Sequence, residues 1–373
     1  MSDPAPLHQV TREHLDALSD EIGIMQHAIG PHPDPAHGYC TDDVARALHV
    51  DLLHQRELGW DAVSSSAWRN VRFLGEAFEP RTGRFRNFRR VDGSWLDGTA
   101  SEDSQGRAML ALGATIAGAP DAALVEAASS LFAQALPAAQ ELRALRARAT
   151  VLLGCDAVMR AAPTASVPTG SAALAYRLLA DRIAATFEAA VTTAWPWPEP
   201  RLTYENALPA RALIVAGRFF RSRAMLDRGL DVLDWLIVSQ TDRSGHLSPV
   251  GNGWWLRGGD KSRFDQQPIE ATALLLAAEA AYDATGEDRY VAAMERAYAW
   301  FLGDNDLGVP VAIPERGASF DGLTPRGVNM NQGAESTLMW LIASEHIRAL
   351  RARRARERAV QPPSAKPMVA ATR

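Results

Sequence analysis

Apolar residues recur every three or four positions along twelve segments of the chain, which is the spacing of an amphipathic helix. Six of these segments are expected to form an outer layer; they span residues 14–28, 62–78, 119–136, 172–190, 221–238 and 289–302. The other six are richer in alanine and apolar on nearly all sides; they span residues 42–55, 104–116, 142–161, 208–220, 268–282 and 334–350. Because a helix that is apolar all round must be buried, the pattern predicts an all-α protein with alternating outer and inner helices.

Polar turns rich in carboxylates or amides run into the inner segments. These turns are Asp42-Asp43, Glu102-Asp103, Glu205-Asn206, Asp265-Gln266-Gln267 and Asn331-Gln332, with a weaker example near Arg148. The inner segments can be aligned on Arg46, Arg107, Arg148, Arg211, Thr272 and Thr337. The steps between these residues are roughly 41 to 65 residues, which leaves room for one helical hairpin and its loop at each repeat. If the inner helices close into a ring and start at the same end, the turns meet at one cavity. The spacing therefore predicts an (α/α)6 toroid of six inner and six outer helices.

The longest connections precede inner helices and are expected to build the mouth of that cavity; they span residues 79–100, 192–204, 241–264 and 303–330. Turn-forming residues at 81–85 and 242–247 predict short β-hairpins in these mouth loops. We expect one toroid domain over residues 1–350. The last residues, 351–373, are basic, contain proline and have few apolar side chains to bury. We therefore expect a disordered tail there.

Composition narrows the class of partner. The chain has 373 residues and a formal net charge of −5, which argues against a nucleic-acid surface. Its N-terminus is polar, no segment has the roughly 18 uninterrupted apolar residues of a membrane span, and two cysteines give no disulfide framework. We therefore expect a cytoplasmic protein that acts on a small molecule or oligosaccharide, with no membrane and no nucleic acid.

Metal and cofactor sites are not expected. His27, His32 and His37 lie close in sequence but lack a ligand spacing on one helix face. The chain also has no nucleophile elbow, phosphate loop or dinucleotide fingerprint. Carboxyl groups are therefore the candidates for chemistry.

Paired carboxylates stand at the starts of the first two inner segments. Asp42 and Asp43 are adjacent, so their mutual repulsion is expected to raise the pKa of one of them. Glu102 and Asp103 occupy the equivalent place one hairpin later. The alternative for each acid is a structural role, because carboxylates in the first turn cap a helix and stabilise its dipole.

Acid–base cleavage of a glycosidic bond needs one protonated carboxyl group and one ionised carboxylate across a cleft. Glu205 follows Tyr204 and a tryptophan-rich loop, and neighbouring aromatic rings raise a carboxyl pKa into the range of a general acid. We expect the general acid to be Glu205 or Asp103, and the base to be Asp43 or Asp265.

Further residues of the mouth loops are expected to bind the substrate. Glu270 and Glu335 occupy the same register in their helices; the alternative is that they pair with arginines such as Arg46, Arg107 or Arg211. Tryptophans in loops are expected to stack on sugar rings; the alternative is that Trp195 and Trp197 anchor their loop beside its prolines. The expected substrate-binding residues are Tyr39, Asp42, Trp95, Glu102, Trp195, Trp197, Tyr204, Trp254, Trp255, Gln266, Gln267, Glu270, Asn331, Gln332 and Glu335.

The pattern resembles the six-hairpin glycosidase-like superfamily, which includes bacterial unsaturated glucuronyl hydrolases. Residues 38–48 and 327–338 look like a bacterial group that accompanies glycan-processing genes. The resemblance implies a glycoside hydrolase that acts on an oligosaccharide or glycoside through carboxylates at different inner-helix starts.

Two alternatives stay open. N-acylglucosamine 2-epimerases and cellobiose epimerases resemble the same ring, which would make the chain a sugar 2-epimerase, an isomerase or a lyase. Those enzymes look to histidines on inner helices, whereas His49, His246 and His346 do not match that constellation well. The third reading is a non-catalytic glycan-binding toroid, which would keep the tryptophans and need no acid pair.

Overall fold

A computed structural model describes residues 4–96, 101–161, 168–190, 192 and 194–360. Within these residues the chain forms twelve α-helices. The inner six are α2 (Thr41–Leu58), α4 (Glu102–Gly118), α6 (Leu145–Arg160), α8 (Leu208–Phe219), α10 (Pro268–Thr285) and α12 (Ala334–Val360). The others are α1 (Glu13–Ala17), α3 (Ser64–Ala77), α5 (Ala122–Ala139), α7 (Thr169–Ala190), α9 (Arg223–Ser239) and α11 (Asp288–Phe301).

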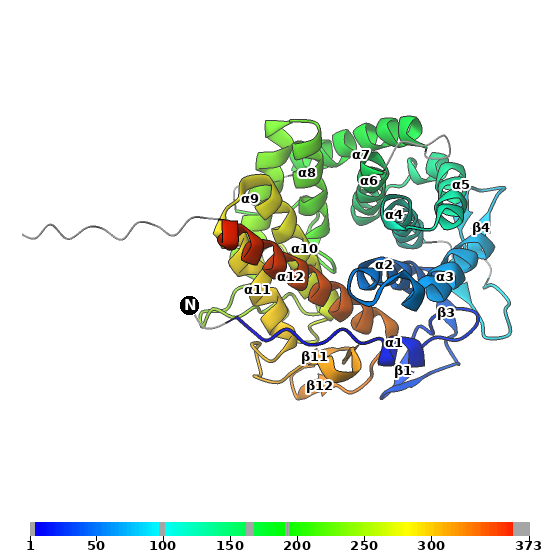
Figure 1. Cartoon of the computed structure of the whole chain (residues 1–373). Coiled ribbons are helices and arrows are strands. Elements are labelled where there is room, and N and C mark those ends of the chain that lie inside the picture. Colours follow the sequence, from blue (N-terminus) through cyan, green and yellow to red (C-terminus); the bar gives the residue numbers. More distant parts are fainter. Residues whose placement is uncertain (1–3, 97–100, 162–167, 191, 193, 361–373) are drawn as a thin grey trace, which may run out of the picture.

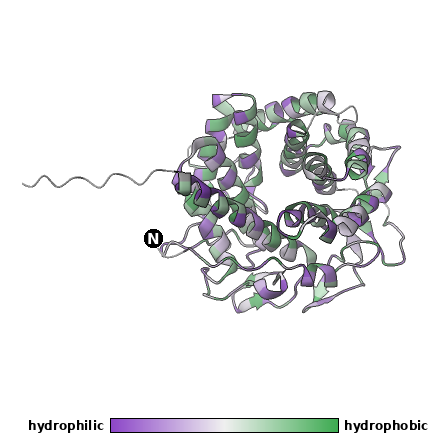
Figure 2. Ribbon diagram, in the orientation of Figure 1, coloured by the Kyte–Doolittle hydropathy of each residue, from purple (hydrophilic) through white to green (hydrophobic). Residues whose placement is uncertain are grey.

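The inner helices close into a ring, which confirms the all-α toroid (Figure 1). Each inner helix packs on the next, and α12 returns to pack on α2. Five long outer helices each cover the inner helix that precedes them in the chain. The buried core lies between the two layers, and hydrophobic residues line the helices that form it (Figure 2).

Local signals in the sequence fix the starts of the inner helices. The hydroxyl of Ser101 caps α4 by accepting a hydrogen bond of 2.9 Å from the backbone N–H of Ser104. Pro209 and Pro268 stand in the first turns of α8 and α10, where the missing N–H costs nothing. The observed bounds of ten helices, among the described residues, follow the expected segments closely.

The first outer helix is one of the two exceptions. A helix was expected over residues 14–28, but α1 ends at Ala17 and the chain then enters a turn. The carboxylate of Asp20 accepts hydrogen bonds from the backbone N–H groups of Ile22 and Gly23, and this local turn replaces the helical bonding. Leu18 and Ile24 are nevertheless buried. The apolar spacing of this segment therefore reflects burial, although the segment is not helical.

Short antiparallel strand pairs decorate the mouth. The expected hairpin at 81–85 is present, between β4 (Phe78–Glu79) and β5 (Arg84–Phe85), whereas 242–247 has a single bridge between Thr241 and Leu247. The other pairs are β1 (Ala28–Ile29) with β2 (His32–Pro33), β3 (Tyr39–Cys40) with β6 (Phe88–Arg89), β7 (Arg201–Leu202) with β8 (Trp255–Leu256), β9 (Ala312–Ile313) with β10 (Ala318–Ser319), and β11 (Gly322–Thr324) with β12 (Gly327–Asn329). Two short 3₁₀ turns, Trp60–Ala62 and Pro314–Arg316, complete the elements.

The last helix is longer than expected. α12 continues to Val360, ten residues into the segment expected to be a disordered tail. Arg351 pairs there with Glu295, and Arg354 pairs with Asp288 of α11, so charges stabilise the extension. The rest of the expected tail, residues 361–373, lies outside the described residues. Elsewhere, α5 is apolar and long enough to span a bilayer, but in this fold it packs on α4.

The helices α4 and α6 cross with their backbones almost in contact, and glycines allow this approach. A Cβ atom on Gly154 would lie 2.6 Å from the carbonyl oxygen of Met109, which is backbone and cannot move aside cheaply. We expect Gly154→Ala to lower the free energy of unfolding by about 1–3 kcal/mol. Gly118→Ala, at the open end of α4, is the matched control and should cost nothing in urea unfolding. Equal stability of the two variants would contradict the crossing.

Candidate active site at the mouth of the toroid

The inner helices start at one end of the ring, and a cavity of about 330 Å³ lies there. We call it the mouth cavity. Four carboxylates border it: Asp42 and Asp43 of α2, Glu335 of α12, and Asp321 of the loop before β11. The fold therefore brings together acids that are almost 300 positions apart in the sequence.

Arg46 organises this group of acids. Its guanidinium donates to Asp43 across 2.7 Å and to Glu335 across 2.8 Å, so it ties α2 to α12 where the ring closes. The side chain of Asp43 is 4% exposed and also accepts a bond from the thiol of Cys40, which locks it in place. The side chain of Glu335 is 39% exposed and faces the cavity. Glu335 is thus the ion-paired carboxylate that a ligand can reach.

Asp42 is in a different environment from its neighbour Asp43. One carboxylate oxygen of Asp42 is buried and has no hydrogen-bond partner among the described residues. Burial raises the pKa of Asp42 to about 6, although Arg107 and Arg46 favour the ionised form. Asp42 therefore takes up a proton at mildly acidic pH while it borders the cavity, which is what a general acid requires.

Glu205 is held by a second arginine. Arg107 of α4 donates to its two carboxylate oxygens across 2.7 and 3.4 Å. Burial raises the pKa of Glu205, but the charge of Arg107 outweighs it and the net pKa is lowered. Its backbone φ of 47° lies in the left-handed region, a strain of about 1–3 kcal/mol. A carboxylate that stays ionised in this way is poorly suited to donate a proton.

A further network joins α4, α6, α8 and α10 beside Glu205. The hydroxyl of Tyr204 donates to Asp103, and the amide of Asn206 donates to Glu270 across 2.8 Å. Arg146 in turn donates to Asn206 across 3.1 Å. Burial raises the pKa of Glu270 to about 7, with its other oxygen unpartnered within the described structure.

Several expected site residues have structural contacts instead. The carboxylate of Glu102 accepts from the backbone N–H groups of Arg143 and Ala144 and so anchors the start of α6. The Gln266 side chain bonds Asp306 and Trp300. The remaining placements are Tyr39, whose hydroxyl bonds Asp20; Asn331, which accepts from Gly30; Gln332, which is buried; and Asp265, which is exposed in the loop before α10. Gln267 borders the mouth cavity as expected.

The tryptophans of the mouth loops divide into anchors and exposed rings. Trp195 and Trp197 are 4% and 0% exposed, and their indole N–H groups donate to loop carbonyls, which is the anchoring alternative. Trp255 stacks on Trp235, and Trp95 packs against Phe73. Trp254 is 40% exposed and is covered on one face by the guanidinium of Arg201.

Two residues of the mouth cavity were not among the expected site residues. Asp321 accepts a hydrogen bond of 2.8 Å from the backbone N–H of Gly333 and points at the mouth cavity from a long loop. His27 borders the same cavity; burial lowers its pKa, so it is neutral, and its ring packs edge-on against His37. Neither residue stands at a helix start, and helix starts were the pattern that indicated the candidate acids.

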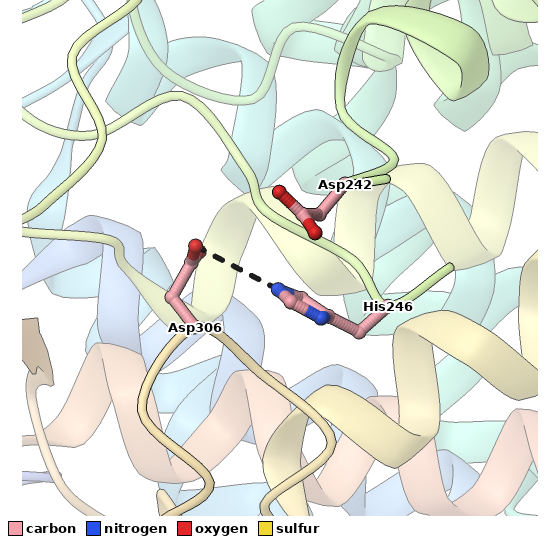
Figure 3. A group of neighbouring side chains, drawn as sticks. All are labelled: Asp242, His246 and Asp306. Carbon is pink, nitrogen blue, oxygen red and sulfur yellow. Dashed lines mark ion pairs between the residues drawn. The ribbon is translucent and has the colours of Figure 1, made fainter. Parts of the chain in front are cut away.

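A separate cluster of Asp242, His246 and Asp306 has the donor types of a metal site (Figure 3). Its ligand atoms all lie within 4.8 Å of one another. However, Arg263 already donates to Asp306 across 2.9 Å. Lys261 lies nearby, and its positive charge attracts the carboxylate of Asp306. The carboxylate is therefore neutralised from within the protein, and the cluster does not fit a divalent cation well.

The sequence matches no protein-family model and no curated protein. The structure is similar to a sugar epimerase from a ruminal bacterium, with a TM-score of 0.69 and 10% identity over 89% of this chain and 94% of that one. It is similar to cellobiose 2-epimerase from Bacillus thermoamylovorans (TM-score 0.68, 14% identity, 92% and 96% covered). It also resembles a GH76 α-mannanase from Bacteroides thetaiotaomicron (TM-score 0.61, 10% identity, 93% and 96% covered). At these identities the likeness establishes the fold.

Proposed function

We propose that this chain, which has the (α/α)6 toroid fold of the six-hairpin glycosidase-like superfamily, is a carbohydrate-processing enzyme that hydrolyses a glycosidic bond at the mouth cavity. The observation that carries the proposal is that two unlike carboxyl groups border the same cavity. Asp42 has a pKa of about 6, and Glu335 is an ion-paired, accessible carboxylate. These are the two states that glycoside hydrolysis needs.

In this mechanism Asp42 donates its proton to the leaving oxygen, and Glu335 activates water or attacks the sugar. Arg46 orients Glu335 through a hydrogen bond, and Asp43 holds Arg46 in place. Arg46 and Arg107 both act on Asp42 electrostatically, so they favour the carboxylate that proton transfer leaves behind. Glu205 is a positioning residue in this proposal, because its carboxylate fixes Arg107.

The second candidate is a sugar 2-epimerase or isomerase. The observation in its favour is that epimerases and a D-mannose isomerase share the toroid, with TM-scores of 0.66 to 0.69. Such a reaction needs a group that removes the proton at the sugar C2. The neutral His27 at the mouth cavity and Glu270, with its pKa of about 7, are the candidates for it.

One experiment separates the two. The purified chain is incubated with a panel of α- and β-linked disaccharides, uronides and oligosaccharides, and released sugar is measured. A parallel series in D2O measures deuterium at C2 of free reducing sugars. We expect release from one linkage class and no deuterium incorporation. Incorporation without release would replace the hydrolase by the epimerase, and ligand-induced thermal shifts without either reaction would indicate a binding toroid.

A further inference from the structure

A second cavity of about 340 Å³ lies at the opposite end of the ring from the mouth cavity. We call it the far-pole cavity. The last two turns of α6, α8 from Arg211 to Phe219, the second half of α10 and the middle of α12 border it, whereas helix starts border the mouth cavity. These four inner helices are consecutive in the ring (Figure 1). The far-pole cavity is therefore a distinct site on the same fold.

Basic side chains accompany the carboxylates of the far-pole cavity. Asp156 pairs with Arg160, and Asp283 pairs with Arg353 across 2.7 Å. Glu279 lies 2.6 Å from Nδ1 of His346. Asp156 also accepts from the hydroxyl of Tyr176.

Two arginines of α8 remain unpaired at this cavity. Both line the cavity, and among the described residues neither Arg211 nor Arg218 has a side-chain hydrogen bond or ion pair. Arg218 lies in the last turn of α8, where a cation complements the helix dipole. Arg211 is the fourth residue of that helix and has no such role. Burial lowers the pKa of Arg211, although Glu279 and Glu205 oppose this effect.

Arg211 is half-buried, and a partly desolvated cation that makes no hydrogen bond or ion pair is a ready contact for an anion. Arg211 and Arg218 are seven residues apart, two turns of one helix, so they point from the same side into the far-pole cavity. Between and beside them, Val215 and Phe219 add apolar surface. The arrangement offers two guanidinium groups to an oxyanion and an apolar wall to whatever carries it.

We propose that the far-pole cavity binds a small molecule that carries an oxyanion of the phosphate type, with Arg211 as the deep contact and Arg218 at the rim. A cavity of about 340 Å³ has room for a molecule the size of a monosaccharide phosphate. Free phosphate offers the same anionic group, so the two sources are separated by experiment. The site does not depend on the reaction at the mouth cavity.

The test measures thermal unfolding and calorimetric binding of the full chain in buffer free of phosphate and sulfate. The probes are inorganic phosphate, glucose 6-phosphate and neutral glucose. We expect both anions to raise the melting temperature with saturation and glucose to have no such effect at this site. Tighter binding of glucose 6-phosphate assigns an organic ligand, and equal binding assigns the free ion.

Variants show whether Arg211 makes the contact. Arg211→Met should weaken anion binding at least tenfold, yet melt no lower than the wild type without anion, because Arg211 makes no side-chain hydrogen bond or ion pair that the substitution would remove. Arg211→Lys should keep part of the binding. Arg243→Gln, an exposed arginine on the turn after α9, is the matched control and should bind as the wild type does.

Three results would overturn the proposal. The first is an anion-induced shift of equal size in Arg211→Met, the second is no shift with either anion, and the third is a large loss of stability in Arg211→Met without anion, which would mean a structural role. If Arg211→Met does not fold, Arg218→Gln takes its place. Weakened binding of both anions in Arg218→Gln supports the site, and unchanged binding refutes it.

Discussion

Asp42→Asn is expected to lower kcat/KM by about 10²–10⁴-fold, the usual contribution of a general acid, while the variant still binds the substrate found in the panel. The reason is that asparagine keeps the shape of the side chain but has no proton to give to the leaving oxygen. Hydrolysis rates and ligand-induced thermal shifts are measured together on the same preparation. Asp61→Asn, an exposed aspartate next to the second outer helix, is the control and should keep full activity.

The pH profile tests the same assignment independently. Burial raises the pKa of Asp42 to about 6, so the protonated form needed for catalysis disappears as the pH rises through that value. We therefore expect kcat/KM of the wild type to fall above about pH 6, and this limb should be absent in Asp42→Asn. An Asp42→Asn variant with wild-type rates, or one that keeps the same limb, would remove Asp42 from the mechanism.

The fold could be predicted from the sequence because burial and helix starts are local signals. The alanine-rich segment that begins at Pro268 is apolar on nearly every side, and it is α10 in the structure. The failure at residues 14–28 has a local cause as well. Asp20 bonds two nearby backbone N–H groups, and this turn competes with a helix that has the same apolar spacing.

The site could be predicted only in part. Adjacent acids at a helix start indicated Asp42 and Asp43, and the sequence also allowed for a Glu335–Arg46 pair, which the structure contains. The protonation states were out of reach, because they depend on cations brought from other helices. Glu205 is flanked by aromatic residues, which indicated a raised pKa, yet Arg107, 98 positions away, lowers it. The carboxyl group at the mouth cavity whose pKa is raised to about 6 is instead that of Asp42.

Arg107→Met is expected to lower the free energy of unfolding by about 3–5 kcal/mol, the cost of leaving a buried carboxylate without its partner. The side chains of Arg107 and Glu205 are only 9% and 12% exposed, so water cannot replace the lost ion pair. Urea unfolding at neutral pH measures the effect. Arg223→Met is the matched control: its pair with Asp227 is exposed, and its loss should cost no more than about 1 kcal/mol.

The double variant Arg107→Met/Glu205→Leu separates an unpaired charge from lost packing. With the carboxylate gone, most of the lost stability should return, because apolar residues of similar size often replace a buried ion pair without cost. Both variants should have a lower kcat/KM in the panel, since Arg107 favours the ionised form of Asp42 that proton transfer leaves behind. Stability and activity therefore respond differently to the second substitution. A double variant as unstable as Arg107→Met would mean that packing, and not the charge of Glu205, sets the role of Arg107.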